Sequence, residues 1–507
     1  MTINGNAALY FVDRHLAEGR SGKTAFIQGD QAMTYGQLAE KSGRMGDLYA
    51  KLGLGQEDRA AMIVHDVLEF PVIFWGSLKA GVVPVAINTL LTAEQYRYIL
   101  TDSRAKALFV SAQLLETIRP ILHELPHLRV VFVVGGEDPV GAPFEAALEQ
   151  CIAGPVKDVS AEDTAFWLYS SGSTGMPKGV RHVHQALQAT SDTYGAKVLS
   201  IKESDKIFSA AKLFFAYGLG NGMTFPMAVG ATTVLLPGRP TPEAVFQIMM
   251  SQRPTIYCGV PTLYAAMLAE AGQGMIPGAE NLRVSISAGE ALPAEIGTRW
   301  KTLTGTDILD GVGSTEMLHI FLSNAPGDVE YGTSGIAVPG YDLRLVDTDG
   351  SLVADDEVGE LLVSGVSSAD GYWNQREKSR QTFEGVWTRT GDKYTRRPDG
   401  RYIYSGRTDD MFKVSGQWVS PFEVEQALSS HESVLEAAVV PALDEEGLEK
   451  PKAFVVPAGD ATINPEALQE HVKTSVGAHK YPRWIEVRDE LPKTATGKIQ
   501  RFKLREG

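Results

Sequence analysis

Several features that define other classes of protein are scarce in this sequence of 507 residues. Cysteine occurs only at Cys151 and Cys258, too few for a disulfide framework or a multi-thiolate zinc site. We expect both to be core thiols of a protein in a reducing cytoplasm. Basic residues are the minority, since 47 Lys and Arg face 62 Asp and Glu for a formal charge of −15. This argues against nucleic acid as the main partner, because binding a phosphate backbone needs a basic face.

Long hydrophobic runs are also missing. The N-terminal residues show no basic start followed by an apolar stretch, so no secretory signal is predicted. The longest run without a charged residue, 213–238, is interrupted by five glycines and two prolines, which predicts turns and short buried strands instead of a membrane helix. We therefore expect no membrane association and a cytoplasmic location.

What is present is the composition of a globular protein, with 44% hydrophobic and 21% charged residues. Between residues 20 and 135, apolar strand-like runs alternate with amphipathic stretches, and Thr34 with Gln37 and Thr92 with Gln95 are candidate capping boxes. The alternation predicts a largely parallel, doubly wound sheet. The expected strands are 24–27, 60–64, 82–87, 107–110 and 130–134.

The pattern changes further along the chain. A second α/β unit is expected between about 160 and 330, with strands at 232–236, 255–260 and 283–288. From residue 341, short strands joined by DTDG and RPDG turns predict an antiparallel β layer, and the last hundred residues suggest a small βααβ domain. The predicted fold class is therefore α/β, with doubly wound α/β subdomains and an antiparallel β layer in a large N-terminal domain and a small α+β C-terminal domain. The predicted division is 1–406, a hinge at 407–411, and 412–507.

The strongest local signal is the segment YSSGSTGMPKGV at residues 169–180, directly after an apolar run. Small residues let backbone N–H groups approach a polyphosphate, hydroxyls add donors, and Lys178 adds a positive charge. A Walker loop would need Gly-Lys-Ser/Thr, whereas Pro177 and Gly179 flank this lysine, so a P-loop kinase or phosphatase is disfavoured. A flexible surface loop would explain neither the preceding strand nor the lysine.

Four further blocks follow in order: DGVGSTE at 310–316, TGD at 390–392, SGRTDD at 405–410 and PKTATGKI at 492–499. With these five blocks the chain resembles, over nearly its whole length, the acyl-adenylate-forming superfamily of acyl-CoA synthetases, peptide-synthetase adenylation domains and luciferases. Three stretches look like the benzoate–CoA ligase group in particular: NAALYFVDRHLAEG from residue 6, KLFFAYGLGNGMTFP from 212 and GVGSTEMLHIFLSN from 311. The resemblance implies ATP, Mg²⁺ and coenzyme A as cofactor and co-substrates.

The resemblance also assigns the nucleotide site. Lys178 and the phosphate loop would hold the β- and γ-phosphates, Glu316 would bind Mg²⁺ because hard cations take oxygen, and Asp392 would accept hydrogen bonds from the ribose hydroxyls. The blander alternatives are a solvated loop acid at 316 and a turn-forming aspartate at 392. The other residues assigned to ATP or AMP are Ser170, Ser171, Gly172, Ser173, Thr174, Gly175, Ser287, Ala288, Gly289, Glu290, Asp310, Gly311, Thr315 and Arg407.

The second half-reaction rests on the C-terminal region. In the TATGK loop, Lys498 would bridge the carboxylate and the α-phosphate, and it completes the predicted catalytic set with Glu316, Thr174 and Lys178. In the superfamily the mobile C-terminal domain rotates between half-reactions, and Asp409 occupies the hinge position. After rotation Lys413, Ser415 and Gly416 would face the site for the thioester step. A solvated basic tail and an ordinary linker acid are the alternatives.

The acyl pocket is assigned to Ala216, Tyr217, Val312 and His319, which together make a flat, mostly apolar slot for an aromatic ring. The imidazole of His319 either faces the pocket, where it would bind a substrate hydroxyl, or turns to the backbone, and both interpretations stay open. His182 and His184 form an HxH pair, but no third ligand is apparent, so a structural or ligand-positioning role is favoured over metal binding.

These assignments predict an ATP-dependent aromatic acid–CoA ligase, with benzoate or a ring-substituted benzoate as the acid and a role in aromatic compound degradation. The alternative is an aryl-acid adenylating enzyme that transfers its acyl group to a carrier-protein pantetheine. The lack of a carrier segment after Gly507 favours free coenzyme A. A nucleotide sensor without turnover is disfavoured by the presence of Lys498 and Glu316. The expected partners are small molecules, and a homodimer stays open.

Overall fold

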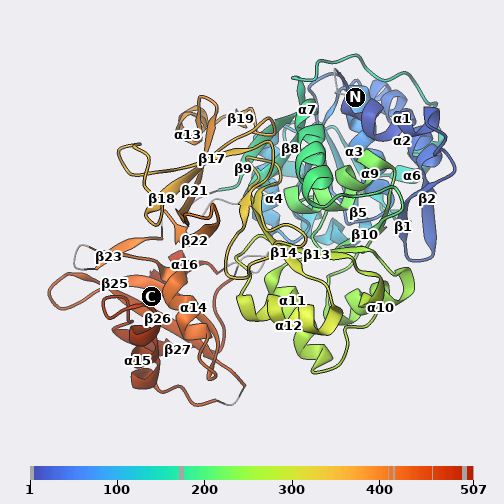
Figure 1. Ribbon diagram of the computed structural model, residues 1–507. Helices are drawn as coiled ribbons and strands as arrows, with labels where there is room; N and C mark the ends of the chain where they lie inside the picture. The colour runs from blue at the N-terminus through green and yellow to red at the C-terminus, as the bar shows by residue number, and fades with distance from the viewer. Residues whose placement is uncertain are drawn as a thin grey trace. The chain divides into compact units, whose positions relative to one another are not determined.

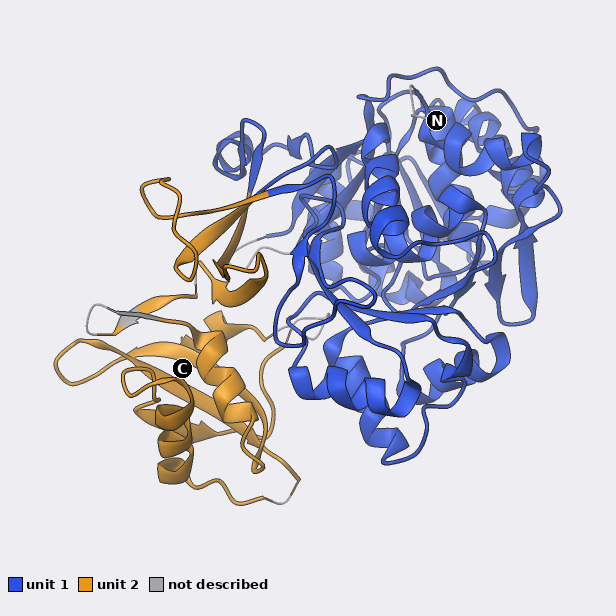
Figure 2. Cartoon of the chain, viewed as in Figure 1, with its two compact units in different colours: residues 1–172, 176–342, 363–388 blue, residues 173–175, 343–362, 389–507 orange. Residues whose placement is uncertain are grey.

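The computed structural model describes residues 5–170, 176–408, 410–414, 417–459, 461–493 and 499–505. The chain forms two compact units, shown in Figure 2. Unit 1 comprises residues 1–172, 176–342 and 363–388, and unit 2 comprises 173–175, 343–362 and 389–507. The predicted hinge at 407–411 thus lies within unit 2, and its function as a hinge stays a prediction.

The first sheet of unit 1 has eight strands in the order β19-β9-β8-β4-β3-β5-β6-β7. Its pairs are parallel from β8 to β7, whereas β9 and β19 run antiparallel to their neighbours. The strands are β3 (Arg59–Ile63), β4 (Val83–Ala86), β5 (Ala107–Ser111), β6 (Val130–Val134), β7 (Ala142–Pro143), β8 (Thr164–Ser170), β9 (Lys178–Val183) and β19 (Gly371–Tyr372).

The second sheet has nine strands in the order β16-β15-β14-β13-β12-β10-β11-β1-β2. Its inner pairs, from β14 to β1, are all parallel. The strands are β1 (Thr24–Gln28), β2 (Gln31–Thr34), β10 (Lys206–Ser209), β11 (Thr232–Leu235), β12 (Ile256–Gly259), β13 (Val284–Ala288), β14 (Ile308–Gly313), β15 (Ile320–Ser323) and β16 (Ile336–Ala337). The predicted doubly wound α/β architecture is therefore confirmed.

Helices bury the apolar faces of both sheets. One core contains side chains from β10, β11, β12 and β14 together with helices α10 (Pro242–Gln252), α11 (Pro261–Ala271) and α12 (Ala294–Thr304), of which α11 and α12 lie side by side (Figure 1). Another core contains side chains from both sheets and from helices α2 (Tyr35–Lys51) and α3 (Glu69–Ala80). Both cysteines are buried and free, as predicted. No helix within the described part of the chain is long and apolar enough to cross a membrane.

Two segments belong to a different sheet from the one expected. Strand β1, expected in the first α/β unit, pairs with β11 in the second sheet, and β8 with β9, expected in the second unit, completes the first sheet. Local apolar patterning identifies a strand but not its partner, because parallel partners are set by the long crossover connections. The strands β1 and β8 were predicted from their apolar runs, β9 was not predicted as a strand, and the grouping of β1 and β8 was wrong.

Both predicted capping boxes are present. Thr34 Oγ1 accepts a hydrogen bond from the backbone N–H of Gln37 at 3.2 Å, while the Gln37 side chain accepts from the Thr34 N–H at 2.8 Å. Thr92 and Gln95 make the same pair at the start of α4 (Ala93–Ser103). Each cap satisfies two otherwise unpaired N–H groups of the first turn and contributes about 1 kcal/mol.

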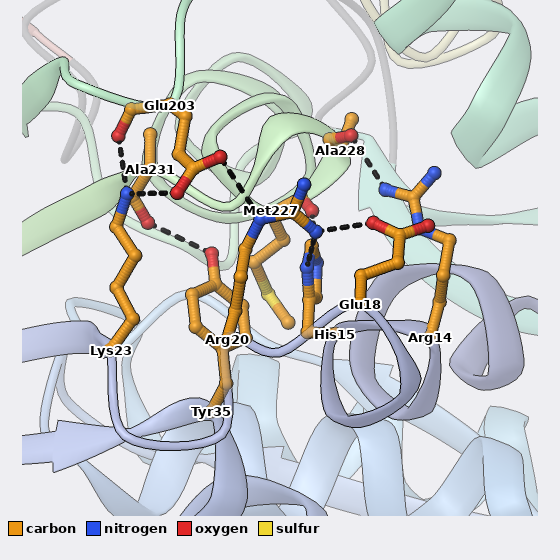
Figure 3. A network of polar contacts seen from close by, with 10 residues as sticks. All are labelled: Arg14, His15, Glu18, Arg20, Lys23, Tyr35, Glu203, Met227, Ala228 and Ala231. Carbon is orange, nitrogen blue, oxygen red and sulfur yellow. Dashed lines mark hydrogen bonds and ion pairs between the residues drawn. The ribbon is translucent and has the colours of Figure 1, made fainter.

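The N-terminal segment caps the helix that follows the predicted acyl pocket (Figure 3). Arg14 donates to Ala228 O at 2.7 Å, His15 Nε2 contacts Met227 O at 2.6 Å, and Tyr35 donates to Ala231 O at 2.8 Å. Burial lowers the pKa of His15 to about 4, so the neutral ring donates through Nε2. The Met227 and Ala228 carbonyls lie in the last turn of α9 (Phe225–Val229), where helix carbonyls lack partners within the helix, and Ala231 follows the C-cap Gly230. Residues near the N-terminus of the chain therefore fix the segment that follows the predicted acyl pocket.

Strands β17 (Asp342–Val346), β18 (Val358–Ser364), β20 (Phe383–Glu384), β21 (Trp387–Arg396) and β22 (Tyr402–Arg407) form a five-stranded sheet. Within it β21 pairs antiparallel with β20 and β22, as the turn-rich sequence predicts. The elements that follow in unit 2 are β23 (Phe412–Val414), β24 (Gln417–Val419), α14 (Pro421–Ser429), β25 (Val434–Leu443), β26 (Glu449–Pro457), α15 (Pro465–Val476), β27 (Trp484–Val487) and α16 (Arg501–Arg505).

The βααβ prediction for the C-terminal region is wrong. A long antiparallel pair, β25 with β26, separates helices α14 and α15, and β27 then adds in parallel to β26. Short apolar runs such as VLEAAVVPAL at 434–443 are compatible with a helix or a strand, and periodicity alone does not distinguish the two.

Candidate active site

The predicted phosphate loop connects two paired strands. Ser170, the last residue of β8, lies opposite Lys178, the first residue of β9, in antiparallel register. Tyr169, directly before the loop, donates a hydrogen bond of 2.6 Å to Asp102 Oδ2. The strand pair therefore fixes both ends of the loop. Five predicted loop residues lie outside the described part of the chain: Ser171, Gly172, Ser173, Thr174 and Gly175.

Glu316 lies beside the end of β8. Its Oε1 accepts a hydrogen bond of 2.8 Å from the Tyr372 hydroxyl and lies 3.5 Å from Ser170 Oγ. The neighbouring Thr315 O is 2.9 Å from His182 Nε2. Burial lowers the pKa of His182 to about 4, so its neutral ring donates to this carbonyl. Strand β9 of the first sheet, through His182, thereby fixes the segment that carries Glu316.

The histidine pair after the loop makes structural contacts. His182 stacks on Phe166 with ring centroids 5.1 Å apart, and His184 Nδ1 accepts from the backbone N–H of Ala7 at 3.2 Å. Among the residues that the structure describes, no group of three or more His, Cys, Asp and Glu side chains is placed to hold a metal ion. These contacts agree with the structural role favoured from the sequence.

Several residues predicted to bind ATP or AMP come together at the carboxyl ends of neighbouring parallel strands, where open α/β sheets bind ligands. Ser287 of β13 pairs with Asp310 of β14, and Ala288 pairs with Gly311. The chain then turns at Gly289, whose φ of +95° suits glycine, before the exposed Glu290. Burial raises the pKa of Asp310 to about 8, which keeps this carboxyl protonated at neutral pH.

The predicted pocket residues Tyr217 and His319 contact each other. Tyr217, in helix α8 (Ala216–Leu219), donates from its hydroxyl to Ile286 O at 3.1 Å, and its carbonyl lies 3.3 Å from His319 Nε2. Burial lowers the pKa of His319 to about 3, so the ring is neutral and donates to Tyr217 O. His319 Nδ1 is buried without a hydrogen-bond partner in the described structure. Ala216 and Val312 are half-buried, Val312 two residues beyond Asp310 on β14.

The ribose-binding candidates lie in unit 2. Asp392 and Arg407 face each other across β21 and β22, and Arg407 donates to Asp392 Oδ1 at 3.0 Å. The Asp392 N–H donates to Thr390 Oγ1 at 3.1 Å after a turn at Gly391, whose φ is +72°. The pair places a carboxylate and a guanidinium together, as predicted.

The residues predicted for the hinge and the thioester step are mostly not described. Asp409, Ser415, Gly416 and Lys498 lie outside the described residues, whereas Lys413 lies on β23 with its backbone opposite Trp418. Sequence reasoning missed three contacts. Asp410 pairs with Arg501 and with Arg505 of α16, and Tyr372 donates to Glu316. None had a local signal, because the partners are far apart in the chain.

Comparison with known proteins gives consistent matches. The family described as AMP-binding enzyme matches residues 13–373, and the AMP-binding enzyme C-terminal domain matches 423–498. The 4-hydroxybenzoate–CoA/benzoate–CoA ligase of Rhodopseudomonas palustris is 54% identical over 99% of this chain and 94% of that protein. The benzoate–CoA ligase of Thauera aromatica is 54% identical over 99% of this chain and 95% of that protein. A crystallised benzoate CoA ligase from Burkholderia xenovorans is 48% identical, covers 99% of both chains and has a TM-score of 0.90.

Proposed function

Since the chain belongs to the AMP-binding enzyme family, we propose that it is an ATP-dependent ligase that joins an aromatic carboxylate to coenzyme A through an acyl-AMP intermediate. The acid is benzoate or a hydroxybenzoate, and the other products are AMP and pyrophosphate. The observation that carries this proposal is the 54% identity, over nearly the full chain, to ligases named for these acids. The carrier-protein alternative has no comparable support.

The adenylation step needs several negative charges to be neutralised together. The strand pair β8–β9 holds Ser170 and Lys178 at the two ends of the phosphate loop, where Lys178 would contact the β- or γ-phosphate of ATP. Glu316 would hold Mg²⁺, and its half-buried carboxylate beside Ser170 is a suitable hard-oxygen donor. When bound, Mg²⁺ would neutralise the polyphosphate. The Ser287–Glu290 turn and Asp310 would line the adenine, and Asp392 would bind the ribose.

The acyl pocket would hold the aromatic ring beside Ala216, Tyr217, Val312 and His319. Tyr217 is fixed by its hydrogen bond to Ile286 O, and His319 is fixed by its hydrogen bond to Tyr217 O. Because the neutral imidazole donates through Nε2, its Nδ1 can only accept. A substrate hydroxyl that reached Nδ1 would therefore act as the donor. This supports hydroxybenzoates as substrates beside benzoate.

The thioester step would use the residues assigned by resemblance, with Lys498 leaving the site and Lys413, Ser415 and Gly416 entering it. Three ion pairs of the neighbouring residues support Asp409 as the hinge. Arg407, two residues earlier, is bound to Asp392, whereas Asp410 is bound to Arg501 and Arg505 of α16. Residue 409 thus lies between one segment attached to the β21–β22 pair and another attached to the C-terminal helix.

The test is an assay of the purified protein with benzoate, the three hydroxybenzoates and octanoate, with AMP and acyl-CoA both quantified. Equal amounts of AMP and aryl-CoA are expected, with octanoate a poor substrate. AMP formation without acyl-CoA, restored by a pantetheinylated carrier protein, would favour the adenylating alternative. In His319→Ala the hydroxybenzoate-to-benzoate ratio of kcat/KM should fall, and an unchanged ratio would remove the proposed role of His319.

A further inference from the structure

Tyr372 connects two charged residues of the proposed phosphate site. Its side chain is 5% exposed, its hydroxyl donates to Glu316 Oε1 at 2.8 Å, and Lys178 Nζ lies 4.7 Å from the centre of its ring. A carboxylate only accepts hydrogen bonds, and an ammonium is attracted to the face of an aromatic ring. One phenol side chain therefore interacts with an anion through its edge and with a cation through its face.

The backbone holds this ring firmly in place. Strand β19 lies beside β9 (Figure 1), with Tyr372 opposite Val180. The Trp373 N–H donates to Gly179 O at 2.8 Å, and the Tyr372 N–H donates to Ser379 Oγ at 3.0 Å. These bonds tie the tyrosine to the strand that begins at Lys178.

The segment that carries Tyr372 also hydrogen-bonds to the backbone of Glu316. The Ala369 N–H donates to Glu316 O at 2.8 Å, three residues before Tyr372. Glu316 is thus held at its carbonyl by the main chain of the segment and at its carboxylate by the Tyr372 hydroxyl. The hydroxyls of Tyr372 and Ser170 both contact Oε1, which leaves Oε2 available to a cation.

We propose that Tyr372 is a positioning residue for the adenylation half-reaction, orienting Glu316 for Mg²⁺ and Lys178 for the polyphosphate of ATP. The inference rests on the proposed function, since it assumes the roles given there to these two residues. Tyr372 acts through them and takes no part in bond making. The thioester half-reaction, in which pyrophosphate has already left, does not depend on it.

Two substitutions separate the two contacts. Tyr372→Phe removes the hydroxyl and keeps the ring, whereas Tyr372→Leu removes both. Tyr96→Phe is the control, because Tyr96, on helix α4, is also buried and its hydroxyl donates to Asn88 O at 3.0 Å, a carbonyl that carries no charge and lies outside the proposed site. Circular dichroism and thermal melts show which variants keep the fold.

The readouts are the Mg²⁺ dependence of benzoate-dependent ATP–pyrophosphate exchange, and binding of Mn²⁺ with a non-hydrolysable ATP analogue followed by electron paramagnetic resonance. For Tyr372→Phe, both half-saturating metal concentrations should rise about tenfold, the range for losing one hydrogen bond to a charged group. Tyr372→Leu should also raise the KM for ATP. Thioester formation from supplied benzoyl-AMP and coenzyme A should be unchanged in both.

A double-mutant cycle decides whether the effect passes through Glu316. In a Glu316→Gln background, Tyr372→Phe should raise the half-saturating metal concentration little further, because the contact between the Tyr372 hydroxyl and the carboxylate is already altered. Wild-type metal dependence in Tyr372→Phe, or the full tenfold loss in both backgrounds, would overturn the inference. Failure of the wild-type protein to form any aryl-CoA would instead refute the proposed function.

Discussion

The proposed role of His319 as a wall of the acyl pocket can be tested by adding one methyl group behind its ring. Gly220 lies in the helical turn η5 (Gly220–Thr224), where an added Cβ would lie 2.3 Å from His319 Cδ2 and 2.6 Å from Nε2. Contacts between non-bonded heavy atoms normally start near about 3.5 Å. The imidazole has little room to retreat, because it is 2% exposed and packs against Phe225 with ring centroids 4.5 Å apart. Gly220→Ala therefore forces the ring away from Tyr217 O.

Gly222→Ala is the control in the same turn. A Cβ there would meet only Leu213 Cδ2 at 3.0 Å and Ser209 Cβ at 3.5 Å. Both substitutions gain about 0.5–1 kcal/mol from helix propensity. Only Gly220→Ala adds an overpacking cost of about 1–3 kcal/mol, so it should be the less stable variant by roughly 2 kcal/mol.

The assays are urea unfolding followed by tryptophan fluorescence and kcat/KM for benzoate. We expect kcat/KM of Gly220→Ala to fall about tenfold, equivalent to about 1.4 kcal/mol of lost transition-state binding, whereas Gly222→Ala stays near wild type. Equal stability and equal kcat/KM in the two variants would refute the reasoning, because the contact with His319 would then have no effect.

Three further predictions concern the two half-reactions and acid stability. Lys498→Ala should slow benzoyl-AMP formation by roughly 10²–10³-fold and spare thioester formation from supplied benzoyl-AMP, as single-turnover assays would show; equal loss of both steps contradicts the assignment. Asp409→Pro, which fixes φ near about −65°, should reduce thioester formation most, and pre-steady-state data with only adenylation damaged would exclude the hinge. His182 has its pKa lowered from 6.5 to about 4, so its neutral form stabilises the fold above pH 6.5 and this contribution is lost as pH falls toward 4. As the pH falls, the free energy of unfolding of wild type, measured by urea titration, should therefore decrease by up to about 1.4 kcal/mol per pH unit more than that of His182→Asn. Parallel pH profiles of the two proteins would argue against a neutral buried ring.

Local sequence chemistry predicted the parts of the fold that depend on neighbouring residues. Thr34 and Thr92 were identified as helix caps because both partners of a capping box lie within four residues. The strand before the predicted phosphate loop was identified for the same reason, since an apolar run is a local signal, whereas the role of the loop itself stays a prediction. The residues of these features are contiguous, so one sequence contains the whole signal.

Features that join distant residues were not predicted. Strand β1 was placed in the wrong sheet because its partner β11 comes some two hundred residues later, and parallel pairing leaves no local pattern. Tyr372 was overlooked because its contact with Glu316 spans 56 positions and a lone tyrosine is unremarkable in a strand. The orientation of His319 was left undecided from sequence, since its hydrogen bond to Tyr217 O depends on the packing of two helices and a loop.

The long-range strand pairs of unit 1 also set the order in which the protein is completed during synthesis. Phe26 pairs with Thr233, and Gly371 pairs with Arg181, so neither sheet has all its strands until most of the chain has been made. Synthesis proceeds at about 5–20 residues per second, so the edge of β1 that will pair with β11 stays unpaired for on the order of ten seconds or more. Exposed strand edges are sites of misassembly, and contacts this remote in sequence form slowly. The arrangement that places strands of both sheets at the proposed active site therefore makes the nascent chain vulnerable until residues near the middle and end of unit 1 have emerged.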